Sequence, residues 1–314
     1  MRLFLLLLFF VLWGHVFSQN IKIEKNIVYG TAADWKSQKR QLKMDLFTPV
    51  SEKSLPLIVF IHGGAFYSGD KDQHTAFCSL LAQRGYIVAN INYRLGFDTS
   101  AAKKDAGVLM ACYRAAQDAS SALRYLMHDA QKNHIDTSSV FLSGESAGAV
   151  TSLAEAYISQ QQWDGLFPFL HQSLGGVNES GNQWNAPYRL RGIISLWGGI
   201  LDTALISSAV SRKIPIELFQ SESDSEIPYQ HSKGQKNLYS SLYGSFDIAQ
   251  YFFNSGSCAQ LYYTKDARHF FGYSHHYVVG AIKSFIDDVL NGRCKNLMKE
   301  NIGERNDLPF SDYQ

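Results

Sequence analysis

The sequence carries few charged residues and almost no excess of either sign. Asp, Glu, Lys and Arg make up 18% of its 314 residues, and 29 basic side chains nearly balance 28 acidic ones. Proteins that bind nucleic acid usually concentrate positive charge, so this composition gives no reason to expect a nucleic-acid partner. Hydrophobic residues make up 46% of the chain, which is ordinary for a globular protein.

The sequence also lacks the residue spacings that metal sites and repeat proteins need. It contains no His-x-x-x-His or Cys-x-x-Cys pair and no glycine motif that would hold a phosphate. We therefore expect neither a metal ion nor a cofactor. The absence of heptads, short repeats and low-complexity tracts leaves a single globular domain as the simplest organisation.

The longest hydrophobic run lies at the start of the chain and is too short to span a membrane. Basic Met1-Arg2 is followed by apolar Leu3–Trp13 and then by Val16–Ser18. A membrane span needs roughly 20 apolar residues, whereas this order of segments is typical of a cleaved secretory signal peptide. We expect residues 1–18 to be removed, leaving a domain 19–314 that is secreted or periplasmic and has no stable membrane span.

Cysteine is scarce, and an exported chain could pair what there is. Four cysteines, Cys78, Cys112, Cys258 and Cys294, allow three pairings. Cys258 and Cys294 flank the last predicted strand–helix unit, so we favour that disulfide. The alternative that all four are small buried apolar side chains stays open.

Apolar strand patterns alternate with amphipathic helix patterns along most of the chain. Alternating polarity in Ile21–Tyr29 and Leu42–Phe47 predicts two antiparallel, half-exposed strands at a sheet edge. Further strands are predicted at Leu55–Ile61, Tyr86–Ile91, Val140–Leu142, Gly192–Trp197, Ile214–Phe219 and Gln260–Tyr263. Helices are predicted at Thr75–Arg84, Val108–Ala130, Ala147–Ile158 and His276–Leu290, with helical material in Gln230–Phe253. This alternation predicts the α/β class, with a mostly parallel central sheet covered by helices on both faces.

Residues 161–190 interrupt that pattern with no clear periodicity. We interpret them as a small lid-like insertion, because insertions near the carboxyl ends of parallel strands shape active sites. Its aromatic residues, Trp163, Phe167, Phe169 and Trp184, are candidates for lid or acyl-pocket residues. An equal alternative is that they pack the insertion onto the body of the domain.

The strongest motif is Gly144-Glu145-Ser146-Ala147-Gly148, between a predicted strand and a predicted helix. Gly-x-Ser-x-Gly in this setting makes a tight turn that projects the serine hydroxyl above the sheet. Side chains larger than glycine at 144 and 148 would collide with neighbouring backbone. The helix N-terminus behind Ser146 favours negative charge that develops there. Ser146 is therefore the predicted nucleophile.

A second glycine-rich segment, His62–Phe66, follows the predicted strand Leu55–Ile61. Such a loop can aim backbone N–H groups at the oxyanion of a tetrahedral intermediate, with Gly64, Ala65 and Ala147 as the predicted donors. We interpret His62 as a residue that orients the loop. Its alternative role as the general base conflicts with the expected chain order, which puts the base last.

Together these motifs resemble the carboxylesterase and hormone-sensitive-lipase branches of the α/β-hydrolases. His62–Phe66 is similar to their oxyanion loop, Asn92–Gly96 to the segment after their next strand, and Gly144–Gly148 to their nucleophile elbow. The resemblance covers roughly residues 40 to 290. It implies an α/β-hydrolase fold and ester hydrolysis without naming a substrate.

The resemblance also implies an acid and a base in the order Ser, Asp, His. Asp224 falls on the acid position, and Ile227-Pro228 matches the end of the family pattern His-Gly-x-x-Asp-x-x-Val-Pro. Gln220 and Ser221 replace its His-Gly head, so neighbouring Glu222 and Glu226 remain rival acids. His269 follows the last predicted strand, where relatives place the base. His275 and His276 are rivals that begin a predicted helix.

The sequence thus predicts a secreted serine carboxylic-ester hydrolase that acts on short-acyl or carbohydrate-linked esters. Phe66, Trp184 and Trp197 are candidate substrate-pocket residues. One alternative is an exported peptidase related to prolyl oligopeptidases, although the chain has no room for their propeller. Another is a non-catalytic binding protein on a hydrolase scaffold, which the irregular acid loop would allow.

Overall fold

The computed structural model describes residues 20–100, 104–206, 213–231, 241–269, 272 and 274–301. The predicted signal peptide lies outside the described residues. Among the helices that are described, none has both the length and the apolar character that crossing a membrane requires.

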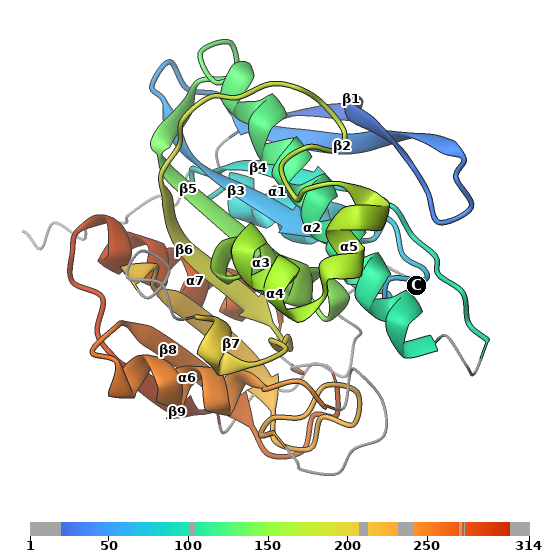
Figure 1. The fold of residues 1–314 in the computed structure, drawn as a ribbon. Helices are drawn as coiled ribbons and strands as arrows, with labels where there is room; N and C mark the ends of the chain where they lie inside the picture. Colours follow the sequence, from blue (N-terminus) through green and yellow to red (C-terminus); the bar gives the residue numbers. More distant parts are fainter. Residues whose placement is uncertain are drawn as a thin grey trace, which may run out of the picture.

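One sheet runs through the described part of the chain, with strand order β1-β2-β4-β3-β5-β6-β7-β8-β9 (Figure 1). Its strands are β1 (Ile21–Ala33), β2 (Lys39–Pro49), β3 (Leu55–Ile61), β4 (Ile87–Ile91), β5 (Ile135–Glu145), β6 (Leu190–Leu196), β7 (Ile216–Ser221), β8 (Ala259–Thr264) and β9 (Leu297–Glu300). β2 pairs antiparallel with β1 and β4, and the remaining pairings are parallel. The predicted mostly parallel sheet with an antiparallel edge is confirmed.

Helices cover both faces of this sheet, as predicted (Figure 1). The described helices are η1 (Lys71–His74), α1 (Thr75–Ala82), α2 (Lys104–His128), α3 (Ala147–Tyr157), α4 (Gln160–Leu166), α5 (Pro168–Leu174), η2 (Thr203–Leu205), α6 (Ser245–Asn254) and α7 (His275–Leu290). The apolar sides of α2, α3 and α6 share one core with the sheet, and those of α1 and α7 share the other. Burial on both faces explains why the central strands are nearly continuous apolar runs.

The C-terminal edge of the sheet contains the favoured disulfide and one strand that was not predicted. Cys258 and Cys294 are bonded, with their Cα atoms 6.0 Å apart, which confirms the predicted pair. Cys78 and Cys112 are free and buried. The bond ties the residue before β8 to the segment between α7 and β9, so it holds this edge together.

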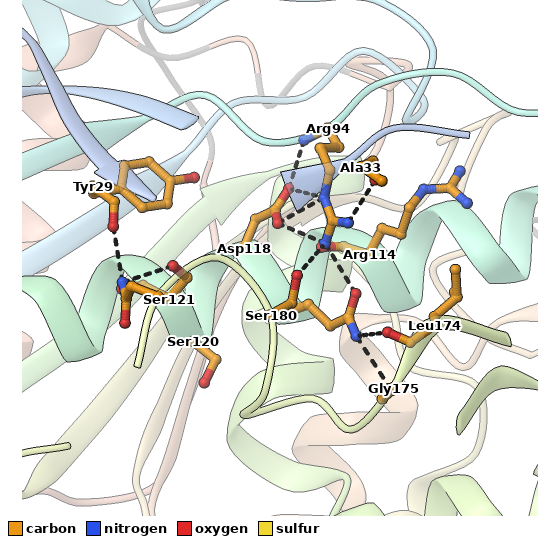
Figure 2. Close-up of polar contacts among 12 residues, drawn as sticks. Tyr29, Ala33, Arg94, Arg114, Asp118, Ser120, Ser121, Leu174, Gly175 and Ser180 are labelled. Carbon is orange, nitrogen blue, oxygen red and sulfur yellow. Dashed lines mark hydrogen bonds and ion pairs between the residues drawn. The ribbon is translucent and has the colours of Figure 1, made fainter. Parts of the chain in front are cut away.

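The insertion packs on α2, which favours the alternative that its aromatic residues attach it to the body of the domain. It contains α4 and α5, neither of which was predicted, and Trp163 is only 1% exposed with its ring edge-on to Tyr113. Gln117 of α2 donates its side-chain amide to the carbonyl oxygen of Leu174 at 2.8 Å (Figure 2). Trp163 of α4 therefore attaches the insertion to the body of the domain.

A buried ion pair connects the insertion to the hairpin of β1 and β2 and to the segment after β4 (Figure 2). The Arg94 guanidinium lies 2.8 Å from Asp118 of α2, and the Arg94 backbone N–H donates to the same carboxylate at 2.7 Å. The guanidinium also donates to the Ala33 carbonyl at 2.8 Å and to the Ser180 hydroxyl at 3.2 Å. These hydrogen bonds compensate the desolvation of the buried charges, as such pairs require. Arg94 thereby fixes the position of its neighbour Tyr93.

Candidate active site

The turn between β5 and α3 places Ser146 in a strained backbone conformation, with φ of 50° and ψ of −120°. The turn is possible because glycines flank the serine. A Cβ atom on Gly144 would lie 2.4 Å from the Gly148 carbonyl carbon, and one on Gly148 would lie 2.0 Å from the Ile61 carbonyl oxygen. The predicted steric need for both glycines is confirmed. Strain of this kind persists only where the surrounding structure holds it, and it is common at functional sites.

Ser146, His269 and Asp224 form a chain of hydrogen bonds from three separate loops. His269 Nε2 lies 2.9 Å from Ser146 Oγ, and Nδ1 lies 2.9 and 3.0 Å from the two Asp224 carboxylate oxygens. A carboxylate only accepts, so Nδ1 carries the hydrogen and Nε2 is left to accept from the serine hydroxyl. The Asp224 side chain is fully buried, and the His269 side chain is 14% exposed. The structure thus brings together the three residues that the sequence singled out.

The side chains of the rival residues take no part in these hydrogen bonds. Glu222 is exposed, and its backbone N–H donates to the Thr264 carbonyl. Glu226 is exposed, and its backbone N–H donates to Asp224 Oδ1 at 2.9 Å. His275 and His276 begin α7 behind the cap residue Ser274, as predicted.

The two residues that depart from the family pattern hold the acid and base loops together. The buried Gln220 amide donates to Asp224 Oδ2 at 3.2 Å and to the Ile227 carbonyl at 2.8 Å, and its oxygen accepts from the Ser245 N–H. The Ser221 hydroxyl accepts from the Ala267 N–H at 3.0 Å. Side-chain hydrogen bonds therefore fix this turn where the relatives have His-Gly.

The loop after β3 is supported from beneath by His62, as predicted, and also by Tyr93. His62 Nδ1 and the Tyr93 hydroxyl both donate to the Gly63 carbonyl, at 2.7 and 3.1 Å, and the two rings are stacked with centroids 4.5 Å apart. Burial lowers the pKa of His62 to about 4, so the ring is neutral at physiological pH. This contact explains the Asn92–Gly96 segment of the family resemblance, because Tyr93 reaches the loop while Arg94 anchors the segment.

Sequence reasoning missed one pair beside the nucleophile. Glu145 is buried, its Oε1 accepts from the Gly63 N–H at 3.3 Å, and His74 Nε2 lies 3.1 Å from the same oxygen. Burial alone would raise the pKa of Glu145, but His74 and the Gly63 N–H outweigh it and hold the pKa below its usual value. The carboxylate is therefore ionised and helps to hold the loop. His74 belongs to no sequence motif, so this contact could not be predicted.

A cavity of about 510 Å³ opens at Ser146 and His269. It is lined by Gly64, Ala65, Tyr67, Ser68, Glu145, Ser146, Trp197, Glu226, Ile227 and His269. Gly64 and Ala65 therefore line the cavity beside Ser146, and Ala147 is the first residue of α3, whose N–H has no acceptor within the helix. Of the three candidate pocket residues, Trp197 lines this cavity.

The other two candidate pocket residues are placed differently. Phe66 is buried with its ring edge-on to Tyr93 beneath the loop, so it supports the loop from below. Trp184 packs on Tyr125 and His128 at the end of α2. Trp184 precedes the amino end of β6, whereas Ser146 follows the carboxyl end of its parallel neighbour β5. The two residues therefore lie at opposite ends of the parallel strands. Trp163, Phe167 and Phe169 are likewise absent from the cavity lining.

Comparison with known proteins agrees with this geometry. Curated relatives include gut esterase 1 of Caenorhabditis elegans (29% identical over 118 residues, 35% of this chain and 20% of that protein) and the para-nitrobenzyl esterase of Bacillus subtilis (32% over 123 residues, 36% and 24%). A longer match is to the isoprenylcysteine alpha-carbonyl methylesterase of Arabidopsis thaliana (26% over 247 residues, 71% and 53%). The chain thus spans from 20% to 53% of the length of these relatives.

Solved structures share the fold at low sequence identity. A Thermogutta terrifontis esterase with bound propionate superposes with a TM-score of 0.57 at 17% identity, over 89% of this chain and 97% of that one. A truncated carbohydrate esterase from gut microbiota gives 0.59 at 14% identity, over 87% and 98%. The family model described as BD-FAE matches residues 44–205, just over half of the chain. The chain therefore belongs to the BD-FAE family and has the α/β-hydrolase fold.

Proposed function

We propose that this protein is a serine carboxylic-ester hydrolase with Ser146 as nucleophile, His269 as general base and Asp224 as the acid that orients the base. The observation that carries the proposal is the unbroken chain of hydrogen bonds from Ser146 Oγ through His269 to the fully buried Asp224 side chain. Nucleophile, base and orienting group within hydrogen-bond reach are the signature of this chemistry.

The reaction follows from the atoms that face one another. Ser146 Oγ attacks the ester carbonyl carbon while its proton passes to His269 Nε2, and Asp224 stabilises the imidazolium. His269 then gives the proton to the departing alkoxide, which leaves an acyl-serine. Water attacks that ester with His269 again as base, and the proton returns to Ser146 as the carboxylic acid leaves. Both halves balance without a metal or an external oxidant.

The negative charge of each tetrahedral intermediate needs donors that are already in place. We assign Gly64, Ala65 and Ala147 to this role, because two of them line the cavity and the third begins the helix behind Ser146. His62, Tyr93 and Glu145 restrain the loop that carries Gly64. Donors held before the reaction stabilise the charge without paying for reorganisation.

We further propose short-acyl or carbohydrate-linked esters as substrates, including acetyl or feruloyl groups on polysaccharide. The support is the cavity volume of about 510 Å³ together with two similar structures, one an esterase with bound propionate and the other a carbohydrate esterase. Export after removal of residues 1–18, which would bring the enzyme to extracellular polysaccharide, is part of this proposal.

Hydrolysis of p-nitrophenyl acetate by residues 19–314 and by the Ser146→Ala variant tests the activity. We expect a rate loss of about 10⁴ or more in the variant, with an unchanged melting temperature. Equal rates would contradict the proposal. Acetylated and feruloylated oligosaccharides assayed beside simple alkyl esters then test the substrate class.

A further inference from the structure

We infer that Glu226 makes the cavity beside Ser146 select against esters that carry negative charge and favour esters that carry a cationic group. The inference rests on the proposed ester hydrolysis and adds the charge of the substrate to it. It concerns a residue that the sequence offered only as a rival acid and that the hydrogen bonds between Ser146, His269 and Asp224 leave without a catalytic role.

The charges that line the cavity have one sign. Glu145 and Glu226 are the acidic residues of its lining, and no Lys or Arg belongs to that lining among the residues that the structure describes. Arg268, next to His269, is exposed and outside the lining. A substrate that enters therefore meets a negative potential close to the reacting atoms.

The two carboxylates differ in how far they are compensated. Glu145 is buried and faces His74 and the Gly63 N–H, so these groups compensate most of its negative charge within the protein. Glu226 is exposed, and within the described ranges its side chain makes neither an ion pair nor a hydrogen bond. Glu226 is thus the carboxylate whose uncompensated charge can interact directly with a substrate.

The backbone at Glu226 is held against the acid itself. The N–H groups of Glu226 and Ile227 both donate to Asp224 Oδ1, at 2.9 and 3.0 Å. The same carboxylate accepts from His269 Nδ1 at 2.9 Å, so one carboxylate joins the backbone of Glu226 to the base. The backbone that carries the Glu226 side chain is therefore anchored beside the residues that hold the base.

Aromatic rings on the same wall complete the chemistry that suits a cation. Tyr67 lines the cavity and is 61% exposed, whereas Trp197 belongs to the lining but is fully buried, so Tyr67 is the ring that a substrate can contact. Aromatic faces attract alkylammonium groups, and a nearby carboxylate adds to that attraction. Because Glu226 is in contact with water, its effect is screened and amounts to roughly threefold per unit of substrate charge.

Charge-matched esters test the inference on residues 19–314. One set places the charge on the acyl end: p-nitrophenyl butyrate, p-nitrophenyl hydrogen glutarate and the p-nitrophenyl ester of γ-trimethylammoniobutyric acid. A second set places it on the alcohol end: propyl butyrate, the butyryl ester of hydroxypropanesulfonate and butyrylcholine. Each kcat/KM is measured for the wild type, for Glu226→Gln and for the control Glu222→Gln, which changes an exposed carboxylate of the same loop outside the cavity lining.

We expect the wild type to prefer the cationic over the anionic ester in at least one set. In Glu226→Gln the cationic-to-anionic ratio of kcat/KM in that set should fall roughly tenfold, since two units of charge separate the substrates. In Glu222→Gln it should stay within about twofold, because that carboxylate is farther away and screened. Ratios that Glu226→Gln leaves unchanged in both sets, or that Glu222→Gln lowers equally, would overturn the inference while hydrolysis of the neutral esters still supported the proposed function. No hydrolysis of any ester would overturn both.

Discussion

The two sides of the candidate active site are built in different ways. On the nucleophile side, Ser146 is positioned by close approach of backbone segments, with hypothetical Cβ atoms on Gly144 and Gly148 only 2.4 and 2.0 Å from backbone atoms. On the acid–base side, Asp224 is positioned by hydrogen bonds from the Gln220 side chain and from backbone N–H groups. The first side depends on the absence of side chains and the second on their presence.

This difference explains which motifs could be read from the sequence. A backbone contact at van der Waals distance tolerates only glycine, so it leaves a fixed pattern in the sequence. A hydrogen bond to a carboxylate can come from several residue types and from several positions. The acid side can therefore differ from the family at Gln220 and Ser221 and still hold Asp224 in place.

The largest expected effect comes from removing the charge of the acid. In Asp224→Asn, the amide favours the wrong histidine tautomer, and kcat for p-nitrophenyl acetate should fall by about 10⁴ with the fold intact. Glu222→Gln is the control in the same loop and should change kcat by less than about threefold. A fall of less than about tenfold in Asp224→Asn would mean that another carboxylate orients His269.

The next effect tests the backbone contact on the nucleophile side. Gly148→Ala should lower the free energy of unfolding by about 3 kcal/mol, because its Cβ would lie 2.0 Å from the Ile61 carbonyl oxygen. Denaturant unfolding measures this. The control is Gly280→Ala in α7, where a Cβ meets no atom within 4 Å, so the helix should gain about 0.5–1 kcal/mol. Equal stability of both variants would contradict the close contact, because it would mean that the turn can accommodate a methyl group at position 148.

The buried histidine beneath the loop predicts a dependence of stability on pH. Burial lowers the pKa of His62 from 6.5 to about 4. As the pH falls below 6.5, His62 therefore binds a proton in the unfolded chain but stays neutral in the folded protein. Stability that is fully present above pH 6.5 is therefore lost towards pH 4, by up to about 3 kcal/mol from this residue. His62→Gln should flatten the curve of unfolding free energy against pH over this interval, and a slope equal to that of the wild type would contradict the assignment.

The smallest expected effect tests the side-chain hydrogen bonds on the acid side. Gln220→Leu removes the donor to Asp224 and leaves the Ser245 N–H without its acceptor, so kcat should fall roughly tenfold and stability by about 1–3 kcal/mol. Gln220→His should retain part of the rate, because the imidazole can still donate one hydrogen bond. The pH–rate profile separates the two roles, since a residue that orients Asp224 changes the apparent pKa of the base and a purely structural residue does not.

Much of the fold could be predicted because burial on both faces leaves a clear pattern. β3 was predicted at its observed bounds, and the disulfide followed from its position around the last strand–helix unit. β5 was predicted at only 140–142 because residues 136–138, near its start, are polar and at least partly exposed. β9 was missed because it has only four residues and is partly exposed. Its pairing with β8 is what identifies it as a strand.

The remaining errors concern tertiary packing, which no local pattern encodes. Trp184 was predicted in the pocket from its place in the insertion. Its ring instead contacts Tyr125 and His128, at the end of the parallel strands opposite to Ser146. His74 belongs to no sequence motif, yet it lies 3.1 Å from Glu145 beside the nucleophile. Both outcomes depend on residues far away in the sequence.

The measurement that tests the account most directly is covalent labelling by a fluorophosphonate, with the adduct located by peptide mapping. The structure predicts a single adduct on Ser146 in the wild type, because His269 Nε2 lies 2.9 Å from its hydroxyl oxygen. The labelling rate should fall by about 10³ or more in His269→Gln. An adduct on a different serine, or equal labelling of the two proteins, would contradict the assignment of Ser146 as a nucleophile activated by His269.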